Sequence, residues 1–201
     1  LSVVVPNAGD IKFVPQRDIE YKQEITDEDR TILGKDVPDF TYGVNLSLQY
    51  KGFEFSMFGQ GISGTKVAFD VYGVHPFYHG QDSPRKYHLK RWTEENPNPH
   101  AAYPRIYSAS SVHTTYNRNF SDYHLFDSDY FRFKTLSLGY TVPSATVKNW
   151  GLQSLKVYVT GENLFTVRAD KKMEDFDPET AGGVIYTLGT KSVAFGVNIS
   201  F

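Results

Sequence analysis

The chain of 201 residues contains no cysteine, and this absence removes several kinds of site at once. Without a thiol there is no disulfide, no cysteine-ligated zinc, no iron–sulfur cluster and no cysteine nucleophile. An excess of one charge is also lacking, because 21 Lys and Arg stand against 23 Asp and Glu. Nucleic-acid-binding domains normally carry a basic excess, so we expect no nucleic-acid partner.

Long apolar runs are missing as well. No run of consecutive apolar residues exceeds three, whereas a membrane-spanning helix needs about 20. The first residues offer neither the basic start nor the apolar stretch of a signal peptide. We therefore expect either a cytosolic protein or a targeting segment upstream of Leu1.

What the sequence does contain is alternation with a period of two. Between Phe40 and Tyr50 every even position is apolar and every odd position is small or polar. Successive side chains of a strand point to opposite faces, so the pattern predicts a strand with one apolar and one polar face. Phe131 and Phe133 are out of phase with Leu136, which predicts a bulge or a wet rim there. The same kind of pattern predicts an all-β fold with strands near 39–50, 53–61, 129–141, 154–165 and 191–201.

The connections between these strands are of two kinds. Residues 51–52 and 143–154 are short, whereas residues 1–38, 62–128 and 166–190 are long. If successive strands are antiparallel, every long segment falls at one end of the sheet and every short turn at the other. Outer-membrane barrels have this asymmetry, with long extracellular loops and short periplasmic turns. A further strand over 67–74 is possible within the longest segment.

The alternation alone leaves two architectures open. A soluble antiparallel sandwich also has one apolar and one polar face. Aromatic residues that bracket the apolar faces (Phe40 and Tyr50, Tyr130 and Tyr140) favour the barrel, because such barrels carry aromatic girdles at both interfaces. Five strands cannot close a barrel, since the smallest have about 8. We therefore expect the C-terminal piece of a larger barrel, or additional strands within the long segments.

A series of short motifs runs along nearly the whole chain. They include DRTILG at 29–34, PDFTYG at 38–43, QGISG at 60–64, RWTEENP at 91–97, LGYTVP at 138–143, VYVTGENL at 157–164 and GVNISF at 196–201. In this order the motifs resemble the C-terminal third of the SusC/RagA-type TonB-dependent transporters of Bacteroidetes outer membranes.

This resemblance implies an outer-membrane location and an all-β fold, with residues 1–201 as the C-terminal part of a plugged barrel of about 22 strands. The signal peptide, the plug domain and the TonB-contacting segment would lie upstream. Members of the family work with a SusD-like surface lipoprotein and import glycans or oligopeptides, using energy delivered through TonB. The resemblance therefore implies a transporter rather than an enzyme, with no catalytic residues, no metal and no cofactor.

Three groups of residues are candidates for function. Polar positions of the predicted strands would line the lumen, and apolar positions such as Leu46 and Leu48 would face lipid. Phe201, by the same resemblance, is the aromatic C-terminal residue that the barrel-assembly machinery reads. Aromatic rings stack on sugars and anchor protein interfaces, so aromatics of the long segment 62–128 are candidate substrate or partner contacts. The lumen candidates are Asn45, Gln49, Glu54 and Gln60, and the loop candidates are Tyr72, Phe77, Tyr78, Trp92, Tyr103 and Tyr107.

Other patterns suggest sites that we discount. Residues 59–64 match a dinucleotide fingerprint, but the β-rich sequence that follows does not predict the helix that the fingerprint requires. His75 and His79 are interpreted as solvated loop residues, and so is the acidic run Glu24, Asp27, Glu28 and Asp29. Residues 10–20 replace an acidic loop that many family members carry and lack its sharp-turn glycine, so we expect no calcium there.

Two alternative functions remain. The first is a soluble β-sandwich that binds carbohydrate. The second is a small autonomous barrel, such as a porin or an outer-membrane esterase. It would need at least three more strands, and the esterase a serine nucleophile, for which the sequence offers no G-x-S-x-G motif.

Overall fold

The computed structural model describes residues 4–17, 25–68, 75–77, 83–171, 174, 176–179 and 189–201. The chain forms two compact units. The sheet unit comprises residues 37–65, 128–169 and 188–201, and the loop unit comprises residues 1–36, 66–127 and 170–187. In the part of the chain that the structure describes, no helix is both long and apolar enough to cross a bilayer.

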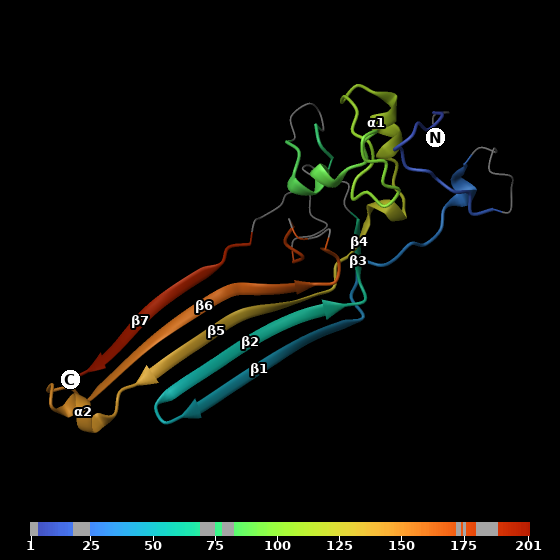
Figure 1. The fold of residues 1–201 in the computed structure, drawn as a ribbon. Helices are drawn as coiled ribbons and strands as arrows, with labels where there is room; N and C mark the ends of the chain where they lie inside the picture. Colours follow the sequence, from blue (N-terminus) through green and yellow to red (C-terminus); the bar gives the residue numbers. More distant parts are fainter. Residues whose placement is uncertain are drawn as a thin grey trace. The chain divides into compact units, whose positions relative to one another are not determined.

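Five antiparallel strands build the sheet unit (Figure 1). They lie side by side in the order β1-β2-β5-β6-β7, so β1 and β7 form the two edges. The prediction of an antiparallel all-β fold is confirmed, and β2 and β6 extend beyond the ranges that alternation predicts. The strands span Phe40–Tyr50 (β1), Phe53–Ser63 (β2), Tyr130–Thr141 (β5), Ser154–Arg168 (β6) and Ser192–Ser200 (β7).

The short connections lie at one end of this sheet, which we call the turn end. Lys51 and Gly52 join β1 to β2 with φ values of 46° and 86°. Positive φ at both central residues is the hallmark of the type I′ hairpin turn, whose twist matches that of the strands. The connection between β5 and β6 contains the short helix α2 (Ser144–Lys148), whose Val147 is fully buried.

The register of the strands gives the sheet two chemically different faces. Residues that pair directly across neighbouring strands share a face. Leu46 pairs with Met57 and Met57 with Leu136, whereas Ser47 pairs with Ser56 and Ser56 with Ser137. The apolar face carries Tyr42, Val44, Leu46, Leu48, Phe53, Phe55, Met57, Leu136, Leu138, Val157, Val159, Val193, Phe195, Val197 and Ile199.

The predicted bulge is present in β5. Phe133 pairs with Gly59 and Thr135 with Phe58, so Lys134 has no partner in the ladder. One extra residue in a strand exchanges the faces to which the side chains beyond it point. This exchange brings Phe131 and Phe133 to the apolar face. The same reversal makes one prediction wrong: Tyr130 does not bracket the apolar face with Tyr140. It pairs with Ile62 on the polar face and is buried.

The apolar face of the sheet is exposed. Leu48 is 55% exposed and Phe195 83% exposed. Among the described residues of the sheet unit, only Tyr130 and Val147 are buried hydrophobic residues. The sheet unit therefore has no core of its own on this face, and the described residues provide no second layer that would make it a sandwich.

The loop unit is built differently, from short elements around buried polar and aromatic side chains. Its elements are η1 (Asp27–Asp29), β3 (Lys66–Ala68), η3 (Lys86–Lys90), α1 (Val112–Asn117), η4 (Asp122–His124) and β4 (Leu125–Asp127), and β3 pairs with β4. Of the strand considered over 67–74, the structure gives β3, and residues 69–74 lie outside the described residues. His75 is 2% exposed. The interpretation of His75 as a solvated loop residue is therefore wrong, and His79 lies outside the described residues.

Candidate functional site

The four polar residues predicted to line a lumen lie together on the polar face of the sheet. Gln49 pairs with Glu54, Asn45 with Phe58, and Gln60 with Arg132. The alternation of β1 and β2 determines this arrangement. Asn45 and Gln49 are an even number of positions apart on β1, and so are Glu54 and Gln60 on β2, so each pair shares a face. The sheet unit thus presents one polar surface that runs across all five strands.

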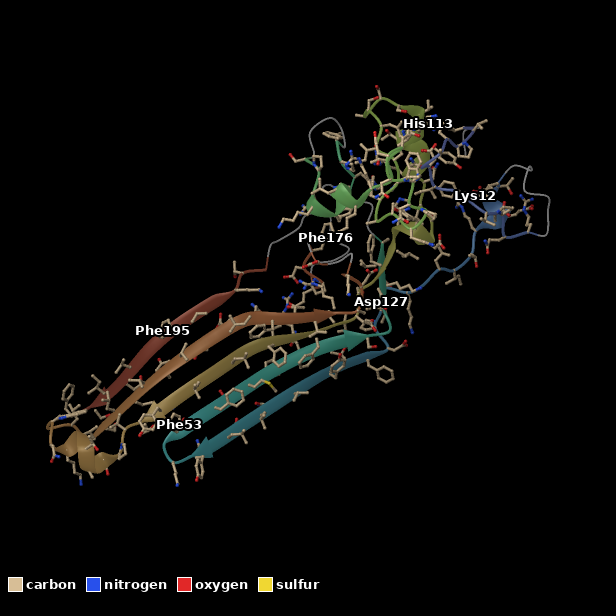
Figure 2. All side chains as sticks on the ribbon, viewed as in Figure 1. Lys12, Phe53, His113, Asp127, Phe176 and Phe195 are labelled. Atoms are coloured by element: carbon tan, nitrogen blue, oxygen red, sulfur yellow. The ribbon has the colours of Figure 1, made fainter. Side chains whose placement is uncertain are left out.

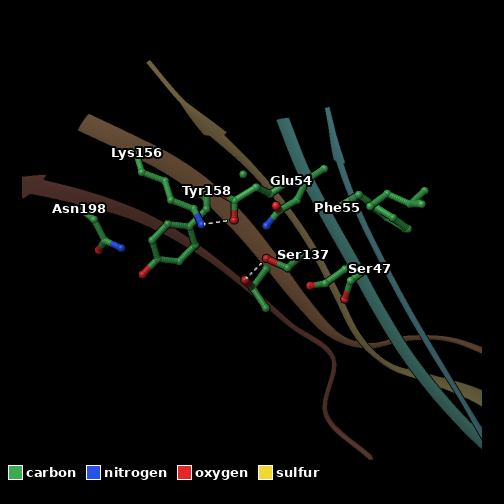
Figure 3. A pocket seen from close by; sticks show the side chains of 12 residues that line it. Ser47, Glu54, Phe55, Ser137, Lys156, Tyr158 and Asn198 are labelled. Atoms are coloured by element: carbon green, nitrogen blue, oxygen red, sulfur yellow. Dashed lines mark hydrogen bonds and ion pairs between the residues drawn. The ribbon is translucent and has the colours of Figure 1, made fainter. Parts of the chain in front are cut away.

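A hollow of about 340 Å³ lies on this polar face (Figure 3). Lys156 Nζ lies 2.5 Å from Glu54 Oε2, and the Thr141 hydroxyl donates to Glu54 Oε1 at 3.3 Å. Ser137 and Thr160 share a hydrogen bond of 3.0 Å between their hydroxyl oxygens. Opposite charges are paired and the other polar groups of the lining are hydroxyls and amides, so the hollow offers hydrogen bonds rather than acid–base chemistry. Other side chains in its lining are Ser47, Gln49, Ser56, Tyr158 and Asn198.

Two glycines explain the sequence that matches a dinucleotide fingerprint. A Cβ on Gly59 would lie 2.4 Å from the ring of Phe131. A Cβ on Gly61 would lie 2.3 Å from the carbonyl oxygen of Tyr130 and 2.7 Å from the ring of Tyr42. Both glycines sit within β2 and accommodate aromatic rings on the apolar face. The motif therefore has a packing role here, and β3 rather than a helix follows it.

Aromatic rings gather at both ends of the apolar face. Near the turn end, Phe53 and Tyr140 lie 4.6 Å apart between ring centroids. At the opposite end, Tyr42 stacks on Phe131 at 6.0 Å, and further rings continue the cluster. The residues between the two clusters are mostly aliphatic, and Phe55 and Phe195 are aromatic exceptions. The rings at the opposite end also include Phe133 and Phe165, whose centroids are 6.4 Å apart.

Three of the predicted loop aromatics make contacts within the loop unit. The hydroxyl of Tyr103 lies 3.0 Å from Nδ1 of His75. The ring of Tyr107 stacks on His113 at 4.9 Å, and the guanidinium of Arg105 lies 5.8 Å from the ring of Trp92. Each of these three aromatic rings is half-buried. Phe77 is exposed, and Tyr72 and Tyr78 lie outside the described residues.

Sequence reasoning missed a cluster around Asp10. Asp10 Oδ2 lies 2.7 Å from Nδ1 of His113, and Asn117 Nδ2 donates to Asp10 Oδ1 at 2.9 Å. Asn117 in turn accepts a hydrogen bond from the backbone N–H of Ile11. The other ring nitrogen of His113 lies 3.0 Å from the amide nitrogen of Asn7. This Asp–His pair therefore fastens residues 7–11 to α1, and an amide of Asn7 rather than a serine hydroxyl lies against the second ring nitrogen of His113, which belongs to the loop unit (Figure 2).

One residue of the acidic run, Asp29, has a structural role. The Asp29 side chain is buried and accepts hydrogen bonds from Arg17 Nη2 at 2.9 Å and from the backbone N–H of Thr26 at 2.9 Å. The bond from Arg17, followed by that from Thr26, holds the pKa of Asp29 well below its usual range. The interpretation of Asp29 as a solvated loop residue is therefore wrong. Asp27 and Glu28 are exposed, and Glu24 lies outside the described residues.

Two curated proteins similar to this chain are both named TonB-dependent receptors. No family model matches the chain. The chain is 30% identical over 149 residues to TonB-dependent receptor P3 of Formosa agariphila, a match that covers 74% of this chain and 14% of the relative. It is 28% identical over 187 residues to TonB-dependent receptor P26 of the same organism, covering 88% of this chain and 18% of the relative. The chain thus spans less than a fifth of the length of these relatives.

Solved structures agree with the sequence relatives. The RagAB peptide importer in its open-open state matches with a TM-score of 0.57 and 25% identity, over 83% of this chain and 17% of that chain. Its closed-closed state matches with a TM-score of 0.56 and 24% identity, which shows the fold. The resemblance to SusC/RagA-type TonB-dependent transporters is therefore confirmed. These relatives are receptors and importers rather than enzymes, which also confirms the prediction of a non-enzymatic protein.

Proposed function

We propose that this chain, a relative of the SusC/RagA-type TonB-dependent transporters, forms part of the barrel wall of an active nutrient importer in the outer membrane. A SusD-like surface lipoprotein would be its partner. TonB would supply the energy through regions of the protein that lie outside the matched part. The substrate would be an oligopeptide or a glycan, and the importer among the structural relatives is described as a peptide importer.

The observation that carries this proposal is the exposed apolar face of the five-stranded sheet. Burial of apolar surface contributes about 25 cal/mol per Å², so a face of this kind is unfavourable in water. A bilayer covers such a face without a second protein layer. The strands are 9 to 15 residues long, and about 9–11 residues suffice to cross a bilayer at a tilt. Aromatic rings at both ends of the face fit the two membrane interfaces.

The polar face would then line the lumen. Asn45, Gln49, Glu54 and Gln60 would contact water, substrate or the plug of the transporter. The long segments would be extracellular, and their aromatic residues would contribute contacts to substrate or lipoprotein. Phe201, 82% exposed beyond the end of β7, would serve as the assembly signal.

Fractionation and uptake test this proposal on the complete protein that contains this chain. We expect it in the detergent-extracted outer-membrane fraction, with an intact mass several times 22.8 kDa and a mobility on gels that changes on heating. Cells that lack it should lose uptake of fluorescent oligopeptides or oligosaccharides. A 22.8 kDa species that stays soluble without detergent would contradict the proposal.

A further inference from the structure

The turn end of the sheet presents two lysines and no acidic residue. Lys51 lies in the turn between β1 and β2, and Lys148 is the last residue of α2, at the same end of the sheet (Figure 1). Residues 50–53 and 140–153, which form this end, contain no Asp or Glu. Both lysines are exposed, and in the described part of the chain neither ammonium group pairs with a carboxylate. The turn end therefore carries uncompensated positive charge.

Lys51 occupies a backbone conformation that is unfavourable for lysine. Its φ of 46° lies in the left-handed region, where a β-carbon is disfavoured and where type I′ turns prefer asparagine or glycine. Among the residues that the structure describes, the side chain of Lys51 makes no hydrogen bond that would favour lysine in this turn. The turn geometry therefore does not explain the lysine, and its ammonium group is left to act on something outside the turn.

The ammonium group of Lys51 lies beside the aromatic cluster at the turn end of the apolar face. Its Nζ is 5.2 Å from the ring centroid of Tyr50, which is 69% exposed. Tyr50 pairs with Phe53 and Phe53 with Tyr140, so the three rings border the same face. Aromatic rings at the edge of a lipid-facing surface lie at the level of the headgroups. If lipid covers the apolar face, Lys51 therefore lies at the depth of the lipid phosphates.

A second lysine and a second aromatic residue follow α2. Trp150, two positions after Lys148, is 60% exposed. The backbone here is well held, because the N–H groups of Trp150 and Leu152 both donate to the carbonyl oxygen of Val147, at 2.9 and 3.1 Å, and the side chain of Val147 is fully buried. Little backbone entropy therefore remains to be lost when this segment binds a partner. We call Tyr50, Lys51, Lys148 and Trp150 the basic turn surface.

We propose that the basic turn surface binds the phosphate group of an anionic phospholipid, with Lys51 as the main contact and Lys148 as a second cation. This inference rests on the proposed function, which places the apolar face in a bilayer, and adds a preference among the lipids there. The ammonium group is a compact charge with three N–H donors, which suits phosphate oxygens. A zwitterionic headgroup carries its own cation beside the phosphate, so an anionic lipid is preferred.

The test measures which lipid lies beside the turn end of the complete protein. A bimane fluorophore is attached to a cysteine introduced as Ser144→Cys, any cysteine outside this chain being replaced by serine. Ser144 is exposed at the start of α2, three residues after Thr141, whose N–H donates to the carbonyl oxygen of Gly52. The protein is reconstituted in phosphatidylcholine vesicles. A small fraction of phosphatidylglycerol or phosphatidylcholine is then added, with identical acyl chains and a nitroxide near the top of one chain as the quencher.

We expect phosphatidylglycerol to bind beside the fluorophore about fivefold more strongly than phosphatidylcholine at low salt. Lys51→Asn should at least halve this preference, and Lys51→Asn with Lys148→Asn should abolish it. Salt at about 1 M should also remove most of it, because the screening length falls to about 3 Å.

Three controls separate charge from folding. Lys51→Arg keeps the charge and should keep the preference. Lys191→Asn removes an exposed lysine of the same unit that precedes β7, away from the turn end, and should also keep it. In zwitterionic detergent, Lys51→Asn should unfold at a temperature no lower than the wild type, because asparagine suits the turn. A lost lipid preference then does not come from a damaged hairpin.

A second fluorophore position, Leu48→Cys on the apolar face, separates this inference from the proposed function. Both lipids should quench it, and to the same extent. If they do and the label at Ser144 shows no preference for phosphatidylglycerol, the lipid site is overturned and the transporter stands. A preference that Lys51→Asn leaves unchanged also overturns the site, because the anionic lipid is then held by other residues. If neither lipid quenches the label at Leu48, lipid does not cover the apolar face and both proposals are overturned.

Discussion

The two units of this chain are built in opposite ways. The loop unit buries polar and aromatic residues such as His88, Asn117 and Phe176, as expected of a folded segment in water. The sheet unit leaves its apolar face exposed, and its order comes from four antiparallel strand pairings. A single chain therefore contains one unit whose side chains supply their own interior and one whose apolar face is left exposed.

This difference predicts that substitutions in the two units act through different forces. In the sheet unit, the effect of a substitution on stability should depend on which face the residue occupies, and not on its exposure alone. In the loop unit, the effect should depend on which buried hydrogen bonds the substitution removes.

A charge on the apolar face should have the largest effect. Leu46→Arg is expected to cost about 2–4 kcal/mol of barrel stability, because the arginine would lie near the middle of the hydrocarbon layer. The neighbouring Ser47→Arg places the same charge on the polar face and should leave the yield close to that of the wild type. Folded yield in the outer membrane measures both. Equal yields for the two variants would contradict the assignment of the faces.

A methyl group added to β2 at Gly61 should have the next largest effect on stability. Gly61→Ala sets a Cβ 2.3 Å from a backbone oxygen, and such overpacking typically costs about 1–3 kcal/mol. Gly43→Ala is the matched control in β1, because its nearest neighbour would be 3.6 Å away. The temperature at which heat-modifiable mobility is lost compares them. A lower temperature for Gly43→Ala than for Gly61→Ala would contradict the close packing described for β2.

In the loop unit, acid should release the segment that Asp29 holds. The pKa of Asp29 is depressed in the folded state, so its stabilisation is complete above the ordinary carboxyl pKa of about 4. The stabilisation is lost progressively as the pH falls from that value through the depressed one, so most of it remains at pH 4. Limited proteolysis at residues 16–17 and 26–29 should therefore remain slow at pH 4, and Asp29→Asn should make it faster at pH 7. Asp27→Asn, at an exposed carboxylate, is the control, and rapid wild-type cleavage at pH 4 would argue against the proposed contact.

The smallest effect is expected at the hairpin between β1 and β2. Lys51 adopts a positive φ that asparagine tolerates better. Lys51→Asn should therefore stabilise the hairpin by roughly 0.5 kcal/mol. A rise in the temperature of heat-induced unfolding would show this, and a fall would argue against the turn type.

The sheet could be predicted from the sequence because its two faces carry different side chains, apolar on one and mostly polar on the other. Alternation revealed the strands, and the phase change between Phe133 and Leu136 revealed the bulge. The reversed facing of Tyr130 followed from the same bulge, since every residue beyond an inserted one changes face. Tyr130 and Tyr140 lie on opposite sides of the bulge, so they occupy opposite faces of the sheet although both positions are even.

The loop unit could not be predicted in the same way. Asp10 and His113 are 103 positions apart, and no periodic pattern links residues that meet through irregular backbone. Asp29 has the sequence surroundings of a solvated acid, yet Arg17 and backbone N–H groups enclose it. The burial of His88 and the exposure of Leu89, one residue later, likewise depend on contacts with residues 102 and 103.

A nitroxide scan of residues 43–49 in the complete protein, reconstituted in lipid, tests whether lipid covers the apolar face of the sheet. The chain has no cysteine of its own, so each introduced cysteine is the only labelled position in this chain. We predict that collisions of the label with oxygen, which concentrates in lipid, peak at Val44, Leu46 and Leu48. Collisions with a water-soluble nickel complex should peak at the positions between them. Labels at these three residues that are shielded from both reagents would mean that protein covers the apolar face, and would contradict the account.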